Sequence, residues 1–230
     1  MHALEQLRYV ARGWEAGDEF PAQEVAAVLA ELAGDNPATL LQACRRLIEY
    51  FPASGRVWWL SARALSAPDP VEGIWEAADE LARDPTGRAL AGALPEAGAI
   101  ALVAPSPSLA AALRRRQDLF VEKLRRADIV VVSAMAAGPR AVLVAERVSA
   151  LAASARRAGQ ALWVVAERGV VLPEALWAQL EERALGSGAV AVMASDELDL
   201  AVGEKGRAPV AEVLSAPTCP PVAELLGWKS

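Results

Sequence analysis

The stretch DIVVVSAMAAGPRAVLVAERVSALAASARRAGQALWVVA, residues 128–166, decides the fold class. It begins and ends with short apolar runs, over residues 128–134 and 161–166, whose central positions are continuously apolar rather than alternating. Such runs are typical of parallel strands, because both faces of a parallel sheet are covered. Residues 145–158 between them have the composition and apolar spacing of a helix. The stretch therefore predicts a strand–helix–strand unit of a parallel sheet.

The same alternation of apolar runs and helical segments continues on both sides of this unit. Further strands are predicted over residues 99–104 and 189–194, further helices over residues 107–126 and 173–185, and edge strands over residues 198–202 and 209–214. We therefore expect residues 96–230 to form a Rossmann-like, mostly parallel sheet domain.

Residues 1–95 show helical periodicity only and predict an all-helical N-terminal domain. In Pro37–Phe51 the apolar residues, Cys44 included, recur every three or four positions and share one helix face. Three helix starts combine a capping side chain with a following proline, which fits the first helical position; the capping residues are Asn36, Asp69 and Asp84. Trp58, Trp59 and Trp75 are predicted to supply the apolar core. The expected fold class is α/β, with an all-helical N-terminal domain followed by the sheet domain.

Composition narrows the classes of function. The chain has 230 residues and a net charge of −6, which argues against nucleic-acid binding, since that normally needs a basic surface. No apolar run approaches the roughly 20 residues of a membrane-spanning helix, and the N-terminus has no pattern of a secretory signal. The chain has two cysteines, Cys44 and Cys219, so a disulfide framework is not expected. We therefore expect a cytoplasmic location.

Open α/β sheets bind ligands beyond the carboxyl ends of their strands, so polar residues there are candidates for ligand binding. They are Ser106, Ser108, Ser133, Arg140, Glu167 and Asp196. Ser106 either caps the following helix or helps to hold a phosphate, and we favour capping because no glycine allows close backbone approach. The segment 195–199, which contains three carboxylates, is interpreted as a solvated turn. The only histidine, His2, is at the terminus, so Ser-His-Asp catalysis and histidine-based zinc sites are not expected. We predict no catalytic residue, no metal and no cofactor.

The segment from Arg126 to Glu167 resembles the central segment of the initiation factor 2B alpha/beta/delta-type proteins, which include methylthioribose-1-phosphate and ribose-1,5-bisphosphate isomerases. In that family a strand ends in Gly-Ala-Asp, a turn follows, and Asn-Lys-x-Gly-Thr opens a helix that leads to the next strand. The resemblance places Ser133-Ala134-Met135 on Gly-Ala-Asp and residues 144–148 on Asn-Lys-x-Gly-Thr. Gly159 and the strand at residues 162–166 fall on their counterparts.

The same resemblance implies that the family's chemical groups are missing. Met135 stands where the family has its acid/base aspartate, and Val144-Ala145 stand where it has the Asn-Lys pair that contacts sugar phosphate. Residues 104–106 hold no counterpart of the isomerases' reactive cysteine. The strand and loop that the family places between the first helix of the sheet domain and Gly-Ala-Asp are also expected to be absent.

These features favour a non-catalytic relative of the isomerases that acts as a protein-interaction or ligand-sensing module. The resemblance further implies a homodimer formed through the α/β domain. One alternative is a sugar-phosphate isomerase with a relocated site that uses Glu167, Asp196 or Glu197 together with Arg140 or Arg168. Another is a phosphosugar or nucleotide binder at residues 106–108. Fold alone does not decide between them.

Overall fold

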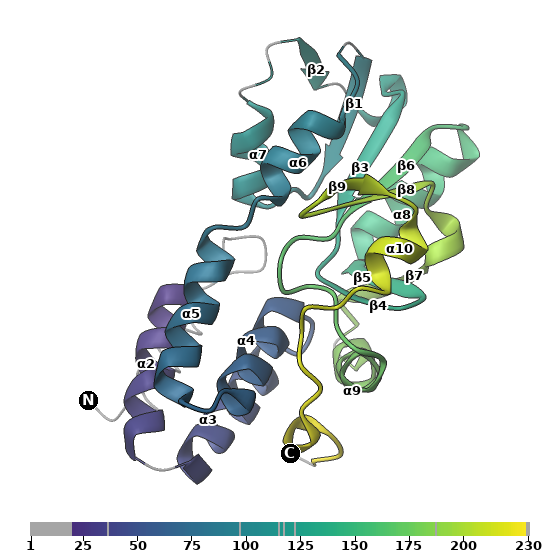
Figure 1. The fold of residues 1–230 in the computed structure, drawn as a ribbon. Helices are drawn as coiled ribbons and strands as arrows, with labels where there is room; N and C mark the ends of the chain where they lie inside the picture. The colour runs from purple at the N-terminus through teal and green to yellow at the C-terminus, as the bar shows by residue number, and fades with distance from the viewer. Residues whose placement is uncertain are drawn as a thin grey trace.

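The computed structural model describes residues 20–35, 37–96, 98–114, 116, 118–121, 123–186 and 188–228, and has an all-helical part followed by an α/β part (Figure 1). The helical part contains α2 (Ala22–Asp35), α3 (Pro37–Tyr50), α4 (Gly55–Ser66), α5 (Pro70–Ala82) and α6 (Thr86–Ala93). The predicted fold class is thereby confirmed. Among the described residues, none of the helices combines the length and the apolar character that crossing a membrane requires.

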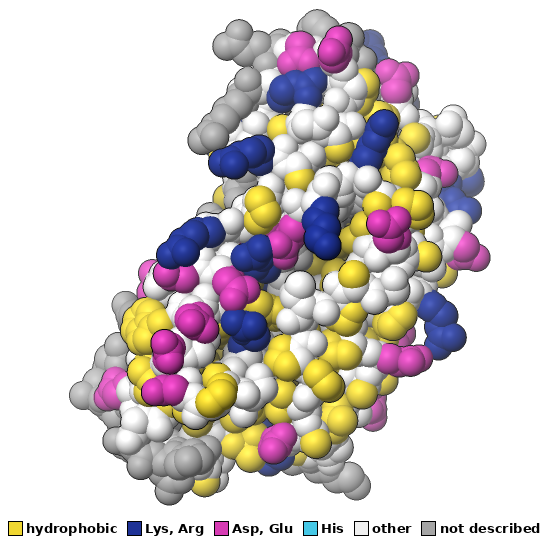
Figure 2. Space-filling view, viewed as in Figure 1, with side chains coloured by type: hydrophobic (Ala, Val, Ile, Leu, Met, Phe, Trp, Pro, Cys, Tyr) yellow, Lys and Arg dark blue, Asp and Glu magenta, His cyan; other side chains and the backbone are white. Residues whose placement is uncertain are grey.

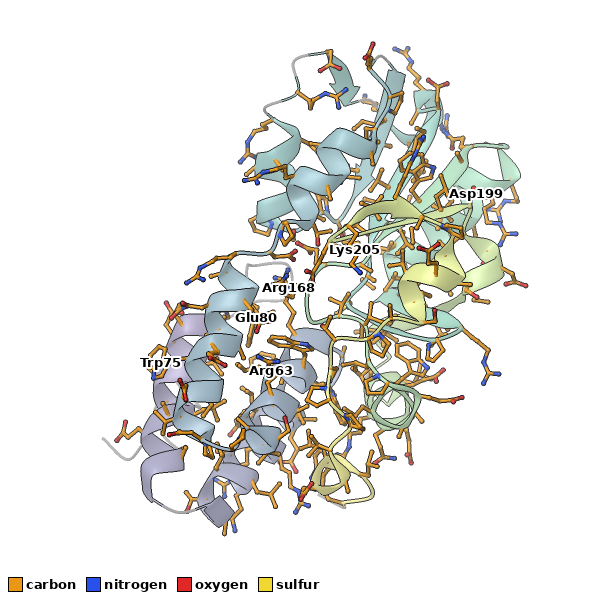
Figure 3. The ribbon with its side chains drawn as sticks, in the orientation of Figure 1. Arg63, Trp75, Glu80, Arg168, Asp199 and Lys205 are labelled. Atoms are coloured by element: carbon orange, nitrogen blue, oxygen red, sulfur yellow. The ribbon has the colours of Figure 1, made fainter. Side chains whose placement is uncertain are left out.

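Local signals in the sequence explain the helical part. Asp69 accepts hydrogen bonds from the backbone N–H groups of Val71 and Glu72, at 3.0 and 3.1 Å, as a capping residue does. Asn36 lies outside the described residues. Trp58 and Trp59 are fully buried, as predicted, but the prediction for Trp75 was wrong. Trp75 is 40% exposed and projects from α5 at the side of the molecule (Figure 3), because the buried face of α5 is already occupied by glycine, isoleucine and alanine.

The main sheet has six strands in the order β2-β1-β3-β6-β8-β9. Its strands are β1 (Gly98–Val103), β2 (Leu119–Val121), β3 (Ile129–Ser133), β6 (Ala161–Val165), β8 (Leu200–Gly203) and β9 (Gly206–Ala208). All neighbours pair in parallel except β8 and β9, which form an antiparallel hairpin. The continuous apolar runs therefore predicted a mostly parallel sheet correctly.

Successive residues of β1, β3, β6 and β8 enter two different apolar cores, which is why these four strands are almost wholly apolar. On one face, Ile100, Val131 and Trp163 pack with α6 and with α7 (Pro107–Leu113). On the other face, Val130 and Leu162 pack with α8 (Glu146–Arg157) and α10 (Val210–Leu214). The result is a sheet between two helical layers, as Figure 1 shows.

A second, three-stranded antiparallel sheet joins the two parts of the chain. It consists of β4 (Ala136–Gly138), β5 (Ala141–Ala145) and β7 (Val190–Ala194), in that order. Its Leu143 shares one apolar core with helices α2–α5, with α9 (Glu174–Leu185) and with Val222 and Leu225 of the C-terminal tail. The helical and α/β parts therefore bury apolar surface against each other, and the boundary near residue 95 stays a prediction.

The connection between β1 and β3 differs from the prediction. The prediction of a single helix over residues 107–126 was wrong. Helix α7 ends at Leu113 and is followed by β2 and by the short 3-10 helix η1 (Leu124–Arg126). After the helix, the guanidinium of Arg116 donates to the backbone carbonyl of Pro95 at 2.8 Å, which ties this segment to the chain that follows α6. A strand is therefore present where the sequence was expected to lack one.

Two edge predictions also need correction. Residues 209–214 form helix α10 rather than a strand, because Pro209 cannot donate to a sheet and fits before a first helical turn. Residues 198–202 are not at an edge, since β8 lies between β6 and β9. Residues 189–194 do form a strand, β7, but it belongs to the antiparallel sheet. The tail ends in the 3-10 helix η3 (Ala223–Leu225).

Candidate functional site

The order of the strands places a candidate site at the carboxyl ends of β1, β3 and β6. After β1 the chain moves outward to β2 and then returns to the opposite side of β1 to form β3. Such a reversal opens a crevice between neighbouring strand ends, where open α/β sheets bind ligands. Ser106 follows β1, Ser133 ends β3 and Glu167 follows β6, so three of the predicted site residues lie at these strand ends.

Ser106 and Glu167 are in direct contact there. The Ser106 hydroxyl donates to Glu167 Oε1 at 2.9 Å, and Ser106 Oγ accepts from the backbone N–H of Leu109 at 3.2 Å. Ser106 therefore caps α7, as predicted, and also ties this cap to the end of β6. Glu167 is only 6% exposed, and a buried carboxylate needs polar partners to stay charged.

The main partner of Glu167 is a cation from the helical part. Arg56, in the first turn of α4, places Nη2 3.1 Å from Glu167 Oε1 and 3.3 Å from Asp84 Oδ2. The side chains of Arg56, Asp84 and Glu167 are 13%, 9% and 7% exposed. This buried triad joins α4, the start of α6 and the end of β6.

Backbone groups complete the triad. Asp84 Oδ2 accepts from the N–H of Arg168 at 2.9 Å, and Asp84 Oδ1 accepts from the N–H and hydroxyl of Thr86 at 2.9 and 2.6 Å. Arg56 Nε donates to the carbonyl of Arg168 at 3.3 Å. Asp84 was predicted only to cap a helix, and the structure adds this second role.

Further charged side chains lie next to the triad, and Figure 3 shows three of them, Arg63, Glu80 and Arg168, in one region. The Arg168 guanidinium pairs with Glu204 and lies 3.9 Å from Glu80, which also pairs with Arg63 at 2.7 Å. The hydrogen bond from Glu204 raises the pKa of Arg168 above its ordinary value. We call the seven residues Arg56, Arg63, Glu80, Asp84, Glu167, Arg168 and Glu204 the interlayer charge cluster.

The chemistry open to this cluster is limited by its own pairing. Four carboxylates face three guanidinium groups, so the cluster has an excess of negative charge and is poorly suited to a phosphate. Aldose–ketose isomerisation needs a positioned proton donor and acceptor, as well as cations that hold the phosphate. Here the cations hold carboxylates of the same chain instead.

One strained residue lies beside the cluster. Ala104, at the end of β1, has a φ of 49°, the left-handed conformation that costs an L-residue about 1–2 kcal/mol. It is the only residue other than glycine with a positive φ among those that the structure describes. The chain reverses sharply at this position, which brings Ser106 back to Glu167.

The other predicted site residues have different surroundings. Arg140 lies in the β4–β5 turn, is largely exposed and pairs with Glu174 at 3.1 Å. Asp196 is exposed in the 3-10 helix η2 (Ser195–Glu197), beside Glu197, which pairs with Arg156. Ser133 is half-buried at the end of β3. The side chain of Ser108 lies outside the described residues.

Met135, Val144 and Ala145 stand where the resemblance would place charged or polar side chains. None of them offers such a group in the structure. Val144 is fully buried in β5 and belongs to the core beneath α8. Ala145 precedes the first residue of α8 and provides no side-chain cap. The backbone carbonyl of Met135 accepts from the N–H of Gly55 at 2.9 Å, which ties this segment to α4.

Sequence reasoning missed Arg56, the cation at the centre of the cluster. Its position gave one signal, since it directly precedes the apolar run Val57-Trp58-Trp59-Leu60 at the start of a helix. A charged residue beside four buried ones must place its head in a polar pocket of the interior or extend it to solvent. The sequence could not identify its partners, because Asp84 and Glu167 are 28 and 111 positions away in the chain and only the fold brings them together.

Neither cysteine forms part of a reactive site. Burial raises the pKa of the Cys44 and Cys219 thiols to about 12, so both are protonated at neutral pH and are poor nucleophiles. Within the described part of the chain, no group of three or more cysteine, aspartate, glutamate or histidine residues is placed to hold a metal ion.

Comparison with known proteins finds similarity in structure only. No protein-family model and no curated protein sequence matches the chain. The C. thermophilum tetrameric eIF2B-beta2-delta2 complex contains a chain that aligns with a TM-score of 0.70 at 13% identity, over 93% of this chain and 92% of that one. The Pyrococcus horikoshii OT3 translation initiation factor eIF-2B aligns with a TM-score of 0.66 at 12% identity, over 92% and 98% of the two chains.

A third structure with this fold is an enzyme. The 5-methylthioribose 1-phosphate isomerase of Pyrococcus horikoshii OT3 aligns with a TM-score of 0.59 at 14% identity, over 93% of this chain and 86% of that one. At such identities the likeness concerns the fold. The chain has the fold of eIF2B subunits and of this isomerase over most of its length, as the resemblance implied.

Proposed function

We propose that this chain is a non-catalytic relative of the initiation factor 2B-like isomerases and acts as a protein-interaction or ligand-sensing module, in the cytoplasm. The observation that carries the proposal is the interlayer charge cluster at the strand ends. Arg56 is held by Asp84 and Glu167 at 3.3 and 3.1 Å, so this cation at the strand ends already has two carboxylate partners.

The energetics of the cluster support this proposal. A sugar phosphate bound at the strand ends must compete with Glu167 and Asp84 for Arg56, and these two carboxylates are covalently part of the chain. Freeing Arg56 would also leave two buried carboxylates without their cation, which is strongly unfavourable. The cluster therefore favours a structural role, in which it fixes the helical part against the sheet.

An isomerase with a relocated site is the alternative. Its support is the contact of Ser106 with the buried Glu167, since a hydroxyl beside a carboxylate is a possible proton relay. Of its other proposed members, Arg168 pairs with Glu204 within the cluster. Asp196, Glu197 and Arg140 lie at the end of the antiparallel sheet, where the backbone N–H of Ser195 donates to the carbonyl of Arg140 at 2.9 Å. The non-catalytic function accounts for more of these contacts.

We also propose that the chain forms a homodimer through its α/β part, as the resemblance implies. The proposal rests on that resemblance and on the fold shared with a chain of a tetrameric eIF2B-beta2-delta2 complex. Light scattering coupled to gel filtration tests the proposal. A homodimer has twice the mass of the 24.2 kDa chain, and a mass of one chain at micromolar concentration contradicts it.

A thermal-shift experiment tests the proposed loss of the family's ligand site. The probes are 5-methylthioribose 1-phosphate, which the name of the similar isomerase gives as its substrate, and ribose 1,5-bisphosphate. Because Arg56 is occupied, we expect neither probe at millimolar concentration to raise the melting temperature through the strand ends.

Two variants locate any shift that does occur. Ser106→Ala alters the strand ends, whereas Ser154→Ala makes the same change on the exposed face of α8. A rise of several degrees that Ser106→Ala loses and Ser154→Ala keeps contradicts the proposal and favours the relocated site. The absence of a rise, or an equal rise in both variants, supports it.

A further inference from the structure

An open groove of about 480 Å³ lies between α6 and the β8–β9 turn. One wall comes from α6, with Arg88, and the other comes from the turn, with Lys205 and Arg207. None of the segments predicted to bind ligands includes these residues. The groove lies on the face of the molecule shown in Figure 2, where several lysine and arginine side chains surround this region.

The charge of the groove is positive, although the chain as a whole is acidic. Arg88, Lys205 and Arg207 are exposed, and among the residues that the structure describes none of them has a carboxylate within ion-pair distance. The one carboxylate that lines the groove, Glu204, is held by Arg168. Three unpaired cations around one hollow attract an anion with more than one charge.

The floor of the groove is small and apolar. We give this name to the small residues Ala89, Gly92 and Ala93, which line the groove on its α6 side. A Cβ atom added at Gly92 would meet no other atom within 4 Å. Gly206 in the turn is likewise open, with no atom within 4 Å of an added Cβ. A volume of about 480 Å³ with small apolar residues on one side suits the body of a small organic molecule, since ligand pockets typically measure about 300–1,000 Å³.

We propose that the groove between α6 and the β8–β9 turn binds a small organic phosphate, with its phosphate groups on Lys205, Arg207 and Arg88. The apolar part of the ligand lies on Gly92 and the neighbouring alanines. A nucleoside diphosphate has this chemistry, and inorganic pyrophosphate has its charged part alone. The inference does not rest on the proposed loss of catalysis, because the groove lies outside the Arg56 triad.

The groove is connected to the interlayer charge cluster through Glu204. This residue lines the groove and pairs with Arg168, and the backbone N–H of Arg168 donates to Asp84. Figure 3 shows Lys205 in the same part of the molecule as Arg168. A ligand in the groove therefore lies next to the contacts that join the helical part to the sheet.

Isothermal titration calorimetry of the full chain with ADP, pyrophosphate and adenosine tests the proposal. We expect ADP to bind more tightly than pyrophosphate, because it also covers the apolar floor, and adenosine to bind weakly or not at all. Lys205→Gln/Arg207→Gln should weaken ADP binding at least about tenfold, since it removes two charged contacts. Gly92→Leu should weaken it as much by filling the groove.

Two matched controls separate local from general effects. Arg46→Gln/Arg157→Gln makes the same change of charge at two exposed positions elsewhere, and Gly34→Leu places the same side chain on α2, where an added Cβ also meets nothing within 4 Å. Both controls should bind ADP as the unaltered chain does. Failure of ADP and pyrophosphate to bind at millimolar concentration overturns the inference, as does equal weakening by the controls. Equal affinity for pyrophosphate and ADP overturns the role given to the floor.

Discussion

Replacing Arg56 by methionine should destabilise the chain more than any single surface substitution. Methionine keeps much of the length of the side chain and removes its charge. The change leaves Asp84 and Glu167 buried without their shared cation, while the side chains of these two residues are only 9% and 7% exposed. The physical cost is therefore that of uncompensated buried charge rather than that of a lost surface contact.

The magnitude follows from the burial of the triad. Removing one partner of a buried ion pair typically costs about 3–5 kcal/mol. The pair between Arg83 and Asp79 provides the comparison, because its side chains are 76% and 49% exposed. An exposed pair at this spacing along a helix contributes about 0.3–0.5 kcal/mol. Arg83→Met is therefore the matched control for Arg56→Met.

Urea unfolding followed by tryptophan fluorescence measures both variants. We expect Arg56→Met to lower the free energy of unfolding by about 3 kcal/mol or more, which for a chain of this size is a fall in melting temperature of about 10 °C. Arg83→Met should stay within about 0.5 kcal/mol of the unaltered chain. Adding Glu167→Gln to Arg56→Met should restore part of the loss, because it removes one of the two stranded charges.

Equal effects of Arg56→Met and Arg83→Met would refute this reasoning. Independence of the two residues would also refute it. In that case Glu167→Gln lowers the free energy of unfolding by the same amount in the Arg56→Met protein as in the unaltered chain. Either result would mean that the contacts at the strand ends do not fix the helical part against the sheet.

Three further predictions concern single positions. Gly55→Ala should lower the free energy of unfolding in urea by about 1–3 kcal/mol, because the added Cβ would lie 2.8 Å from the Cα of Val170. No measurable loss of stability would contradict this close approach. Ala104→Gly should be neutral or stabilising by up to about 1 kcal/mol, whereas Ala104→Val should be destabilising, since φ is 49° there. The Cys44 thiol has its pKa raised by burial from 9.0 to about 12, so the native chain keeps a proton that the unfolded chain loses. Stability should therefore fall as pH rises above 9.0, more steeply than in Cys44→Ala, by about 1.4 kcal/mol per pH unit; identical slopes in the two proteins would contradict this.

The sequence predicted the central sheet well, for a physical reason. Strands covered on both faces have no polar face, so β1, β3 and β6 stand out as continuous apolar runs between helices. The antiparallel strands β4 and β5 were missed because β4 has only three small residues, Ala136–Gly138, and β5, Ala141–Ala145, runs directly into helix α8. Residues 209–214 were misassigned because a short run after a proline, apolar at four of its five positions, fits both a strand and one helical turn.

The candidate site was predictable only in part. Ser106 and Glu167 follow strands, so the rule that ligands lie at strand ends places both in the crevice. Their contact is consistent with that rule. Arg56 and Asp84 come from the helical part, and no local pattern indicates which helix covers the strand ends. Asp196 also follows an apolar run, but that run, β7, belongs to the second sheet. Arg140 is separated from the end of β3 by β4 of that sheet, which the sequence did not distinguish from the first.

The most direct test of the central claim is a turnover experiment. The full chain is incubated with 5-methylthioribose 1-phosphate and, separately, with ribose 1,5-bisphosphate, and ³¹P NMR follows the conversion of each aldose phosphate to its ketose. Because Arg56 and Glu167 hold each other at 3.1 Å, we predict no conversion above the rate without protein, even with protein and substrate at equal concentration. Conversion that Ser106→Ala or Glu167→Gln abolishes would contradict the account and make the strand ends an active site.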